Sequence, residues 1–172
     1  MVSKIEVVSI ILVSLLFATT SFSLKCDNVY DYTLSGLKAK QPDNILEGCD
    51  GCGYLYSNVT DPYLFTGYMS SCWVLPHMIA EKYAPEVNIT YFDYYCSEVE
   101  KDNASYCYDT YYINMDLGTG AEEVWLTSLC CCYSDNCSRE FLDPSIPVTG
   151  SNVQRHTSRR LIRDKVVVNK RH

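Results

Sequence analysis

Ten cysteines constrain this chain more than any other feature of its sequence. An even number of cysteines in an oxidising compartment indicates a disulfide framework, which here would hold up to five bridges. We therefore expect a small domain whose shape is set by cross-links as much as by a hydrophobic core. The cysteines are Cys26, Cys49, Cys52, Cys72, Cys96, Cys107, Cys130, Cys131, Cys132 and Cys137.

Cys49 and Cys52 form a C-x2-C pair, which in other proteins binds zinc or performs redox chemistry. A zinc site would need a second close pair or histidines, and His77 is the only histidine before residue 143. A redox pair would open a helix, whereas the glycines around this pair favour a turn. We expect neither a metal nor a cofactor. The glycines are Gly48, Gly51 and Gly53.

The first residues predict secretion. Lys4 lies in a short charged start, residues 7–18 are apolar, and Ser21 and Ser23 are small residues before a cleavage site at Leu24. This order is typical of a signal peptide, here residues 1–23. The apolar run is shorter than the ~20 residues that span a bilayer. We expect a secreted, extracellular product with no membrane span after signal removal.

The cysteine-rich region, residues 24–142, is expected to be an all-β, disulfide-rich domain with long loops. Fifteen tyrosines supply much of its apolar surface, and a tyrosine can pack its ring while its hydroxyl stays wet. Because such a core is thin, we expect reduction of the bridges, each contributing ~2–4 kcal/mol, to unfold it. β-branched and aromatic residues predict strands over 88–96, 106–113 and 124–131, and a hairpin formed by 54–59 and 63–68. Pro76 predicts one short helix over 76–83.

Charge divides the mature chain in two. Residues 24–142 hold 18 acidic and 6 basic side chains, whereas residues 143–172 hold 2 acidic and 7 basic ones. The acidic domain argues against nucleic acid or an anionic membrane as a partner. The tail, residues 143–172, has no regular periodicity and is expected to be disordered. It could contact polyanions, and the dibasic pairs at 159–160 and 170–171 could be cut by a secretory protease.

Three sequons predict N-glycosylation at Asn58, Asn88 and Asn103. A fourth match at Asn136 lies inside a tight cysteine loop, where we expect no glycan. Because a glycan is bulky, a side of the domain that carries two of them is a poor protein interface.

The segment 131–137 reads C-C-Y-S-D-N-C and closes a domain that begins Leu24-Lys25-Cys26. These two ends resemble the three-finger superfamily, which includes lymphocyte-antigen and urokinase-receptor-like domains. The run Cys130-Cys131-Cys132 is also similar to the nematode ET module. The chain departs from the three-finger pattern at Val29, where that family has a second cysteine, and at Ser138, where it has asparagine.

The resemblance implies a small palm of crossed bridges from which three β loops project as fingers. It pairs Cys132 with Cys137 and joins Cys131 to an upstream cysteine such as Cys107. It also implies a binding protein, whose partner is a cell-surface receptor, a channel or a matrix protein. Asp135 is expected to fix a turn. Exposed tyrosines on the loops are candidate contacts, namely Tyr91, Tyr94, Tyr111 and Tyr112.

Two other classes of function are considered. A secreted phospholipase carries C-C-x-x-H-D-x-C, but Ser134 stands where the catalytic histidine would be, and His77 is the only general base of that kind in the domain. We therefore expect no enzyme activity. A tyrosine-rich matrix component is the other alternative, although the chain lacks the internal repeats usual in such proteins.

Overall fold

The computed structural model describes residues 23–102, 104–115, 122–142 and 153–163, so residues 1–22 of the predicted signal peptide lie outside it. Strands account for most of the regular structure in these ranges. In chain order the elements are β1 (Leu24–Leu34), β2 (Leu37–Cys49), β3 (Cys52–Ser57), β4 (Phe65–Cys72), α2 (Val74–Tyr83), α3 (Ile89–Glu100), β5 (Ser105–Met115), β6 (Glu122–Cys132), α4 (Arg139–Leu142) and β7 (Val153–Arg163).

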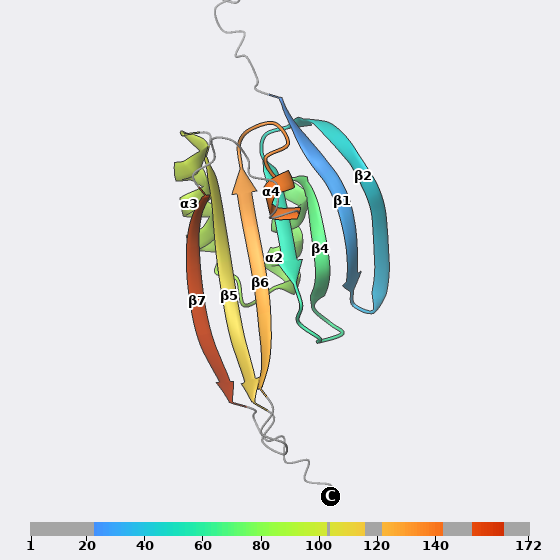
Figure 1. The fold of residues 1–172 in the computed structure, drawn as a ribbon, viewed down its shortest axis with the longest axis vertical. Coiled ribbons are helices and arrows are strands. Elements are labelled where there is room, and N and C mark those ends of the chain that lie inside the picture. The colour runs from blue at the N-terminus through green and yellow to red at the C-terminus, as the bar shows by residue number, and fades with distance from the viewer. Residues whose placement is uncertain (1–22, 103, 116–121, 143–152, 164–172) are drawn as a thin grey trace, which may run out of the picture.

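All the strands belong to one sheet with the order β2-β1-β4-β3-β6-β5-β7. Three successive antiparallel hairpins build it, namely β1 with β2, β3 with β4, and β5 with β6. Figure 1 shows the three hairpins side by side, with their turns pointing toward the same end of the sheet. Most of the cysteines lie at the opposite end, where β1, β3 and β5 begin and where β2, β4 and β6 end. The structure confirms a small, disulfide-rich β domain.

The sequence predicted most of these strands. Residues 106–113 lie in β5, residues 124–131 lie in β6, and β3 pairs with β4 as the predicted hairpin. β1 and β2 were not predicted, and β2 in particular is polar, contains a proline and has few strand-forming residues. Its pairing is set by a two-residue turn in which Ser35 and Gly36 have φ values of 49° and 77°. Two positive φ angles are what a tight hairpin turn requires.

Two helices lie between β4 and β5. The predicted helix over 76–83 is confirmed as part of α2, with Pro76 in the first turn, where a missing N–H costs no hydrogen bond. The prediction of a strand over 88–96 was wrong, because residues 89–100 form α3. The Asn88 side chain caps this helix by accepting a hydrogen bond from the Tyr91 N–H. Phe92, Cys96 and Val99 then repeat at helical spacing and are buried.

The main core lies between the two helices and one face of the sheet. Phe92 and Ile79 pack there against Leu55, Met69 and Leu129, which alternate with the outward-facing residues of β3, β4 and β6. The Cys96–Cys131 disulfide joins α3 to β6 across this core. The helices therefore cover one face of the sheet and leave the other face to a different set of side chains.

The C-terminal tail differs from the expectation over part of its length. Residues 153–163 form β7, which pairs in parallel with β5 and lies at the edge of the sheet. The backbone of an edge strand can accept any extended segment, whatever its side-chain pattern, which is why composition alone did not indicate this strand. The other tail residues, 143–152 and 164–172, lie outside the described ranges.

Candidate functional site

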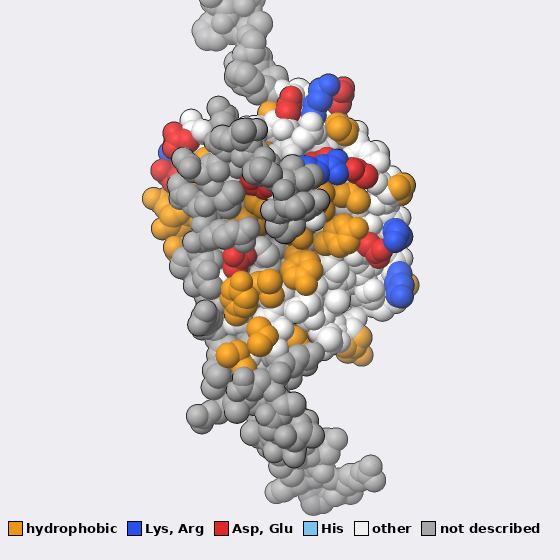
Figure 2. All heavy atoms as spheres, viewed as in Figure 1, with side chains coloured by type: hydrophobic (Ala, Val, Ile, Leu, Met, Phe, Trp, Pro, Cys, Tyr) orange, Lys and Arg blue, Asp and Glu red, His pale blue; other side chains and the backbone are white. Residues whose placement is uncertain are grey.

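The face of the sheet opposite α2 and α3 carries the most distinctive surface of the domain, and we call it the open face. In Figure 1 it is turned toward the viewer, with the short helix α4 in front of it. Tyr54 and Tyr56 of β3 and Tyr68 of β4 project from this face and are half-buried. Figure 2 shows hydrophobic side chains gathered on the same side of the molecule. The solvent-facing side of an antiparallel sheet is usually polar, whereas the open face carries several aromatic side chains.

Ladder pairing places one line of side chains across five strands of this face. Tyr68 lies opposite Asp31 on one side and Tyr56 on the other. Tyr56 in turn lies opposite Ser128, which lies opposite Asp109. We call these five residues the tyrosine row. Its two aromatic rings lie between carboxylates that come from β1 and β5.

Both carboxylates of the tyrosine row already have partners. Lys40 of β2 donates a hydrogen bond to Asp31 over 2.7 Å, and the Ser128 hydroxyl donates one to Asp109 over 2.5 Å. Asp109 is only 4% exposed, whereas Asp31 lies at the surface. The exposed Asp31 carboxylate can orient a partner, while the tyrosine rings supply apolar contact area.

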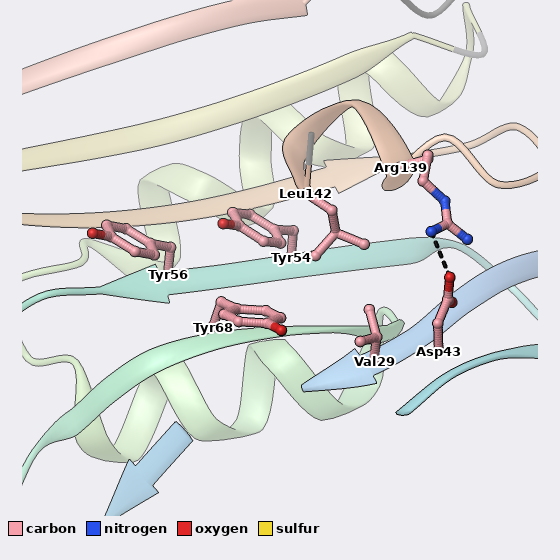
Figure 3. Close-up of a pocket in the computed structure, with 7 residues that line it drawn as sticks. All are labelled: Val29, Asp43, Tyr54, Tyr56, Tyr68, Arg139 and Leu142. Atoms are coloured by element: carbon pink, nitrogen blue, oxygen red, sulfur yellow. Dashed lines mark hydrogen bonds and ion pairs between the residues drawn. The ribbon is translucent and has the colours of Figure 1, made fainter. Parts of the chain in front are cut away.

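A groove of about 430 Å³ extends from Tyr56 and Tyr68 of the tyrosine row toward Arg139. Figure 3 shows the three tyrosine side chains on the same side of β3 and β4, with Arg139 and Asp43 at one end. This volume lies within the range of ligand pockets. A smaller hollow of about 170 Å³ lies on the other side of β3, so Tyr54 and Tyr56 line both. The groove is lined by Val29, Asp43, Tyr54, Tyr56, Tyr68, Arg139 and Leu142.

Helix α4 is held at the end of the groove by charges. Arg139 pairs with Asp43 over 2.6 Å and with Asp27 over 2.5 Å. Asp27 is fully buried and also accepts a hydrogen bond from Ser138. Burial raises the pKa of the Asp27 carboxyl, although the neighbouring Arg139 guanidinium opposes this rise. The anchored helix places Phe141 against Tyr54, with ring centroids 5.8 Å apart.

All ten cysteines are paired in the structure. The link between Cys132 and Cys137, which the resemblance implied, is present. The suggested link from Cys131 to Cys107 was wrong. Cys131 points toward the helices and bonds Cys96, whereas Cys107 bonds Cys130, its ladder partner on the open face. The remaining pairs are Cys26–Cys52 and Cys49–Cys72.

Two of these bridges interleave along the chain, because Cys49 lies between Cys26 and Cys52 while its own partner, Cys72, lies beyond them. They therefore tie the first hairpin to the second. The sulfurs of Cys52, Cys132 and Cys137 also lie within 4.8 Å of one another. All three are in disulfides, so none is a thiolate that could bind a metal.

Asp135 fixes the closing loop to the start of the sheet. Its carboxylate accepts a hydrogen bond from the Lys25 N–H over 2.9 Å, and the Asn136 N–H donates to the Lys25 carbonyl over 2.7 Å. Asp135 was expected to fix a turn, and its carboxylate instead holds a backbone N–H 110 residues away in sequence.

Two of the three predicted glycosylation sites lie in the described ranges, and Asn103 lies outside them. Asn58 and Asn88 are both exposed. Asn88 uses its oxygen to cap α3, which leaves its nitrogen free of that contact. Asn58 accepts from the Leu126 N–H and donates to the Val124 carbonyl, so only one hydrogen on its nitrogen is engaged there. Asn136 has a buried side-chain oxygen, in keeping with its exclusion.

The candidate contact tyrosines are divided between the two sides of the sheet. Tyr111 lies on β5 and lines the smaller hollow of the open face, whereas Tyr91 and Tyr94 belong to α3. Tyr112 is in β5, and its side chain lies outside the description. Sequence reasoning missed Tyr54, Tyr56 and Tyr68 as contacts. The alternation of Tyr54 and Tyr56 along a predicted strand was the one signal that could have indicated a shared face.

His77, the one candidate general base, lies on α2. Its Nε2 atom is 2.8 Å from a carboxylate oxygen of Asp93, and its ring lies edge-on to Trp73 with centroids 4.9 Å apart. This contact joins α2 to α3 on the helix side of the sheet. It belongs to the packing of the helices and not to the open face.

No family model, curated protein or solved structure matches this chain. None of the helices within the described ranges is long and apolar enough to cross a bilayer. Five disulfides in a domain of this size are compatible with an extracellular protein.

Proposed function

We propose that this chain is a secreted, non-enzymatic binding protein that contacts an extracellular protein partner through the open face. The observation that supports this most strongly is the tyrosine row, in which two tyrosines from adjacent strands meet between partnered carboxylates. Tyrosine is enriched at protein interfaces because it combines a large apolar ring with a hydroxyl that tolerates water.

The disulfides support the same proposal. A binding surface is most effective when it is rigid before it meets its partner, since less conformational entropy is then lost on binding. The Cys107–Cys130 bridge lies on the open face, and the Cys26–Cys52 and Cys49–Cys72 bridges hold neighbouring hairpins together. We further propose that the domain is three-finger-like. Its three antiparallel hairpins lie side by side, two of its bridges interleave, and the Cys132–Cys137 bridge closes a short loop.

The proposal also includes the signal peptide and N-glycans at Asn58, Asn88 and Asn103. An oxidising compartment would supply both the bridges and the glycans. The basic tail is proposed as a secondary contact for polyanions, since the domain itself is acidic.

Binding of the labelled, secreted protein to intact cells and to extracellular matrix of the source organism tests this function. We expect saturable binding that Tyr56→Ser and Tyr68→Ser each weaken by at least ~10-fold, because truncated aromatic contacts are typical hot spots. Tyr94→Ser is the matched control, since Tyr94 is 60% exposed but lies on the helix side. Equal losses in all three variants, or binding that does not saturate, would contradict the proposal.

A further inference from the structure

A cluster of tyrosine rings lies on the helix side of the sheet, away from the open face. Tyr91, Tyr94 and Tyr95 come from α3, whereas Tyr106 and Tyr108 come from β5. Contacting rings in this cluster have centroids 4.6 Å to 5.9 Å apart. The cluster begins at the surface with Tyr94 and ends in the core with Tyr106. Aromatic packing explains most of these contacts, but one pair has a more particular geometry.

Tyr91 and Tyr95 are four residues apart, so their side chains lie above one another on the same face of α3. Their ring centroids are 4.6 Å apart and the ring planes are tilted by 44°. A hydrogen bond to the Tyr95 side chain raises the pKa of the Tyr91 phenol, in keeping with hydroxyl groups that lie next to each other. The contact between the hydroxyls brings together the ring edges beside them, which carry the ortho carbons. These are the atoms that become bonded when two tyrosines couple oxidatively.

The neighbouring pairs lack this arrangement. Tyr95 and Tyr106 are stacked, with ring planes only 15° apart, so they present faces to each other. Tyr94 and Tyr95 are nearly perpendicular, at 88°, so an edge meets a face. Tyr91 and Tyr108 also meet edge-on, at 64°, with centroids 5.9 Å apart. The rings in these three pairs are all farther apart than those of Tyr91 and Tyr95. The geometry therefore singles out one pair in a cluster of five tyrosines.

We propose that Tyr91 and Tyr95 are a modification site at which a haem peroxidase and hydrogen peroxide form an intramolecular dityrosine cross-link. Each phenol loses one electron and one proton and becomes a phenoxyl radical. The two radicals couple through their ortho carbons, and the hydrogen on each coupled carbon moves to the adjacent oxygen and restores the phenol. In total the protein loses two hydrogen atoms, and one hydrogen peroxide molecule takes them up and becomes two water molecules.

The position of the pair favours an internal product. Cys96, the residue after Tyr95, is bonded to Cys131, so the second half of α3 is fixed to the sheet. A radical on Tyr91 therefore meets a partner ring already in contact, whereas coupling to another molecule requires a collision. The cross-link would join two successive turns of α3 and hold the helix even after its disulfide is reduced.

Treatment of the purified, folded, deglycosylated protein with a haem peroxidase and hydrogen peroxide tests the proposal. After reduction and trypsin digestion, both tyrosines fall in the peptide 83–101, between Lys82 and Lys101. We expect monomeric protein to give this peptide with two hydrogens fewer and with dityrosine fluorescence. Fragmentation should produce no backbone ions that separate residue 91 from residue 95.

Tyr91→Phe and Tyr95→Phe should each abolish the modified peptide, because phenylalanine keeps the ring but lacks the hydroxyl. Tyr94→Phe is the matched control from the same helix and should retain it. An unmodified peptide from the wild-type protein, a modified peptide from Tyr91→Phe, or its loss in Tyr94→Phe would overturn the proposal. Covalent dimers linked through Tyr94 without the internal link would also overturn it and would favour a matrix role. None of these results depends on the proposed partner binding.

Discussion

Asp27 is fully buried where β1 meets α4, although a carboxylate is costly to remove from water. Its main compensation is Arg139, which also bonds Asp43 at the end of the groove. This cluster connects the stability of the domain to the shape of its open face, because Arg139 is the first residue of the helix that closes the groove.

Replacing Asp27 by asparagine should change how stability depends on pH. Burial raises the pKa of Asp27 above its ordinary value of 3.8, so the folded state holds this proton more tightly than the unfolded state. The contribution of the protonated Asp27 to the free energy of unfolding is therefore complete below pH 3.8, and it is lost as the pH rises through the raised pKa. Asparagine does not titrate and so does not lose this contribution. The free energy of unfolding of Asp27→Asn should therefore increase relative to that of the wild type as the pH rises.

Urea unfolding of both proteins at several values between about pH 3 and about pH 7 measures this difference. A difference that stays constant over that range would show that the Asp27 carboxyl has the same pKa in both states. If the free energy of unfolding of Asp27→Asn instead falls relative to that of the wild type as the pH rises, the Arg139 guanidinium outweighs burial at Asp27.

Gly67 is required by the close contact between β4 and β1. Its φ is 119°, and an added Cβ would lie 2.3 Å from the Asp31 carbonyl oxygen. We expect Gly67→Ala to lower the free energy of unfolding by about 3 kcal/mol or more, through backbone strain and overpacking together. Gly36→Ala is the control, because its φ is also positive at 77° but no atom lies within 4 Å of the added Cβ. That variant should lose about 1 kcal/mol, and equal losses in a urea titration would contradict this account.

Tyr54, Tyr56 and Tyr68 of the open face could not be identified from the sequence. Tyr56 and Tyr68 meet because β3 pairs with β4, but Tyr56 meets Ser128 only through a register between strands 72 residues apart. Alternation places a residue on one face or the other of its strand, but it does not say which strand lies beside it. The link between Cys132 and Cys137 was foreseen only because the closing motif resembles that of a known family.

Among the elements, α3 shows how tertiary packing overrides local propensity. Residues 88–96 include Ile89, Thr90 and several aromatic residues, which favour a strand. The same segment also carries a capping residue and buried side chains at helical spacing. Helix burial against the sheet and the bond from Cys96 to Cys131 decide the outcome, and neither is visible in a short window of sequence.

The cap and the sequon at Asn88 can be separated by three variants. Asn88→Ala removes both, Asn88→Asp removes the sequon but keeps a good cap, and Thr90→Ala removes the sequon but leaves the capping asparagine. Measured on deglycosylated protein, Asn88→Ala should lose about 1 kcal/mol of unfolding free energy, whereas the other two should lose much less.

The same variants test the glycan. Each should lower the mass of the secreted protein by one glycan that an endoglycosidase removes from the wild type. Unchanged mass in all three would show that Asn88 is not modified. A stability loss in Thr90→Ala as large as that in Asn88→Ala would contradict the capping role.

For the molecule as a whole, the sequence was sufficient to predict an all-β, disulfide-rich domain and the positions of most strands. It could not predict the β1–β2 hairpin, whose second strand is polar, or the strand β7, which pairs in parallel with β5. It also could not predict most of the cysteine pairs, because pairing depends on which strands become neighbours. The interleaved bridges and the three hairpins are thus properties of the assembled sheet.

The Cys96–Cys131 disulfide holds α3 against one face of the sheet, so the opposite, open face stays uncovered. The proposed binding surface therefore depends on the disulfide pairing. A peptide map of the secreted protein under non-reducing conditions, with free thiols alkylated beforehand, measures it. We predict no alkylated cysteine and the five links Cys26–Cys52, Cys49–Cys72, Cys96–Cys131, Cys107–Cys130 and Cys132–Cys137. A link from Cys131 to Cys107, or free thiols at several positions, would contradict both the fold and the binding surface built on it.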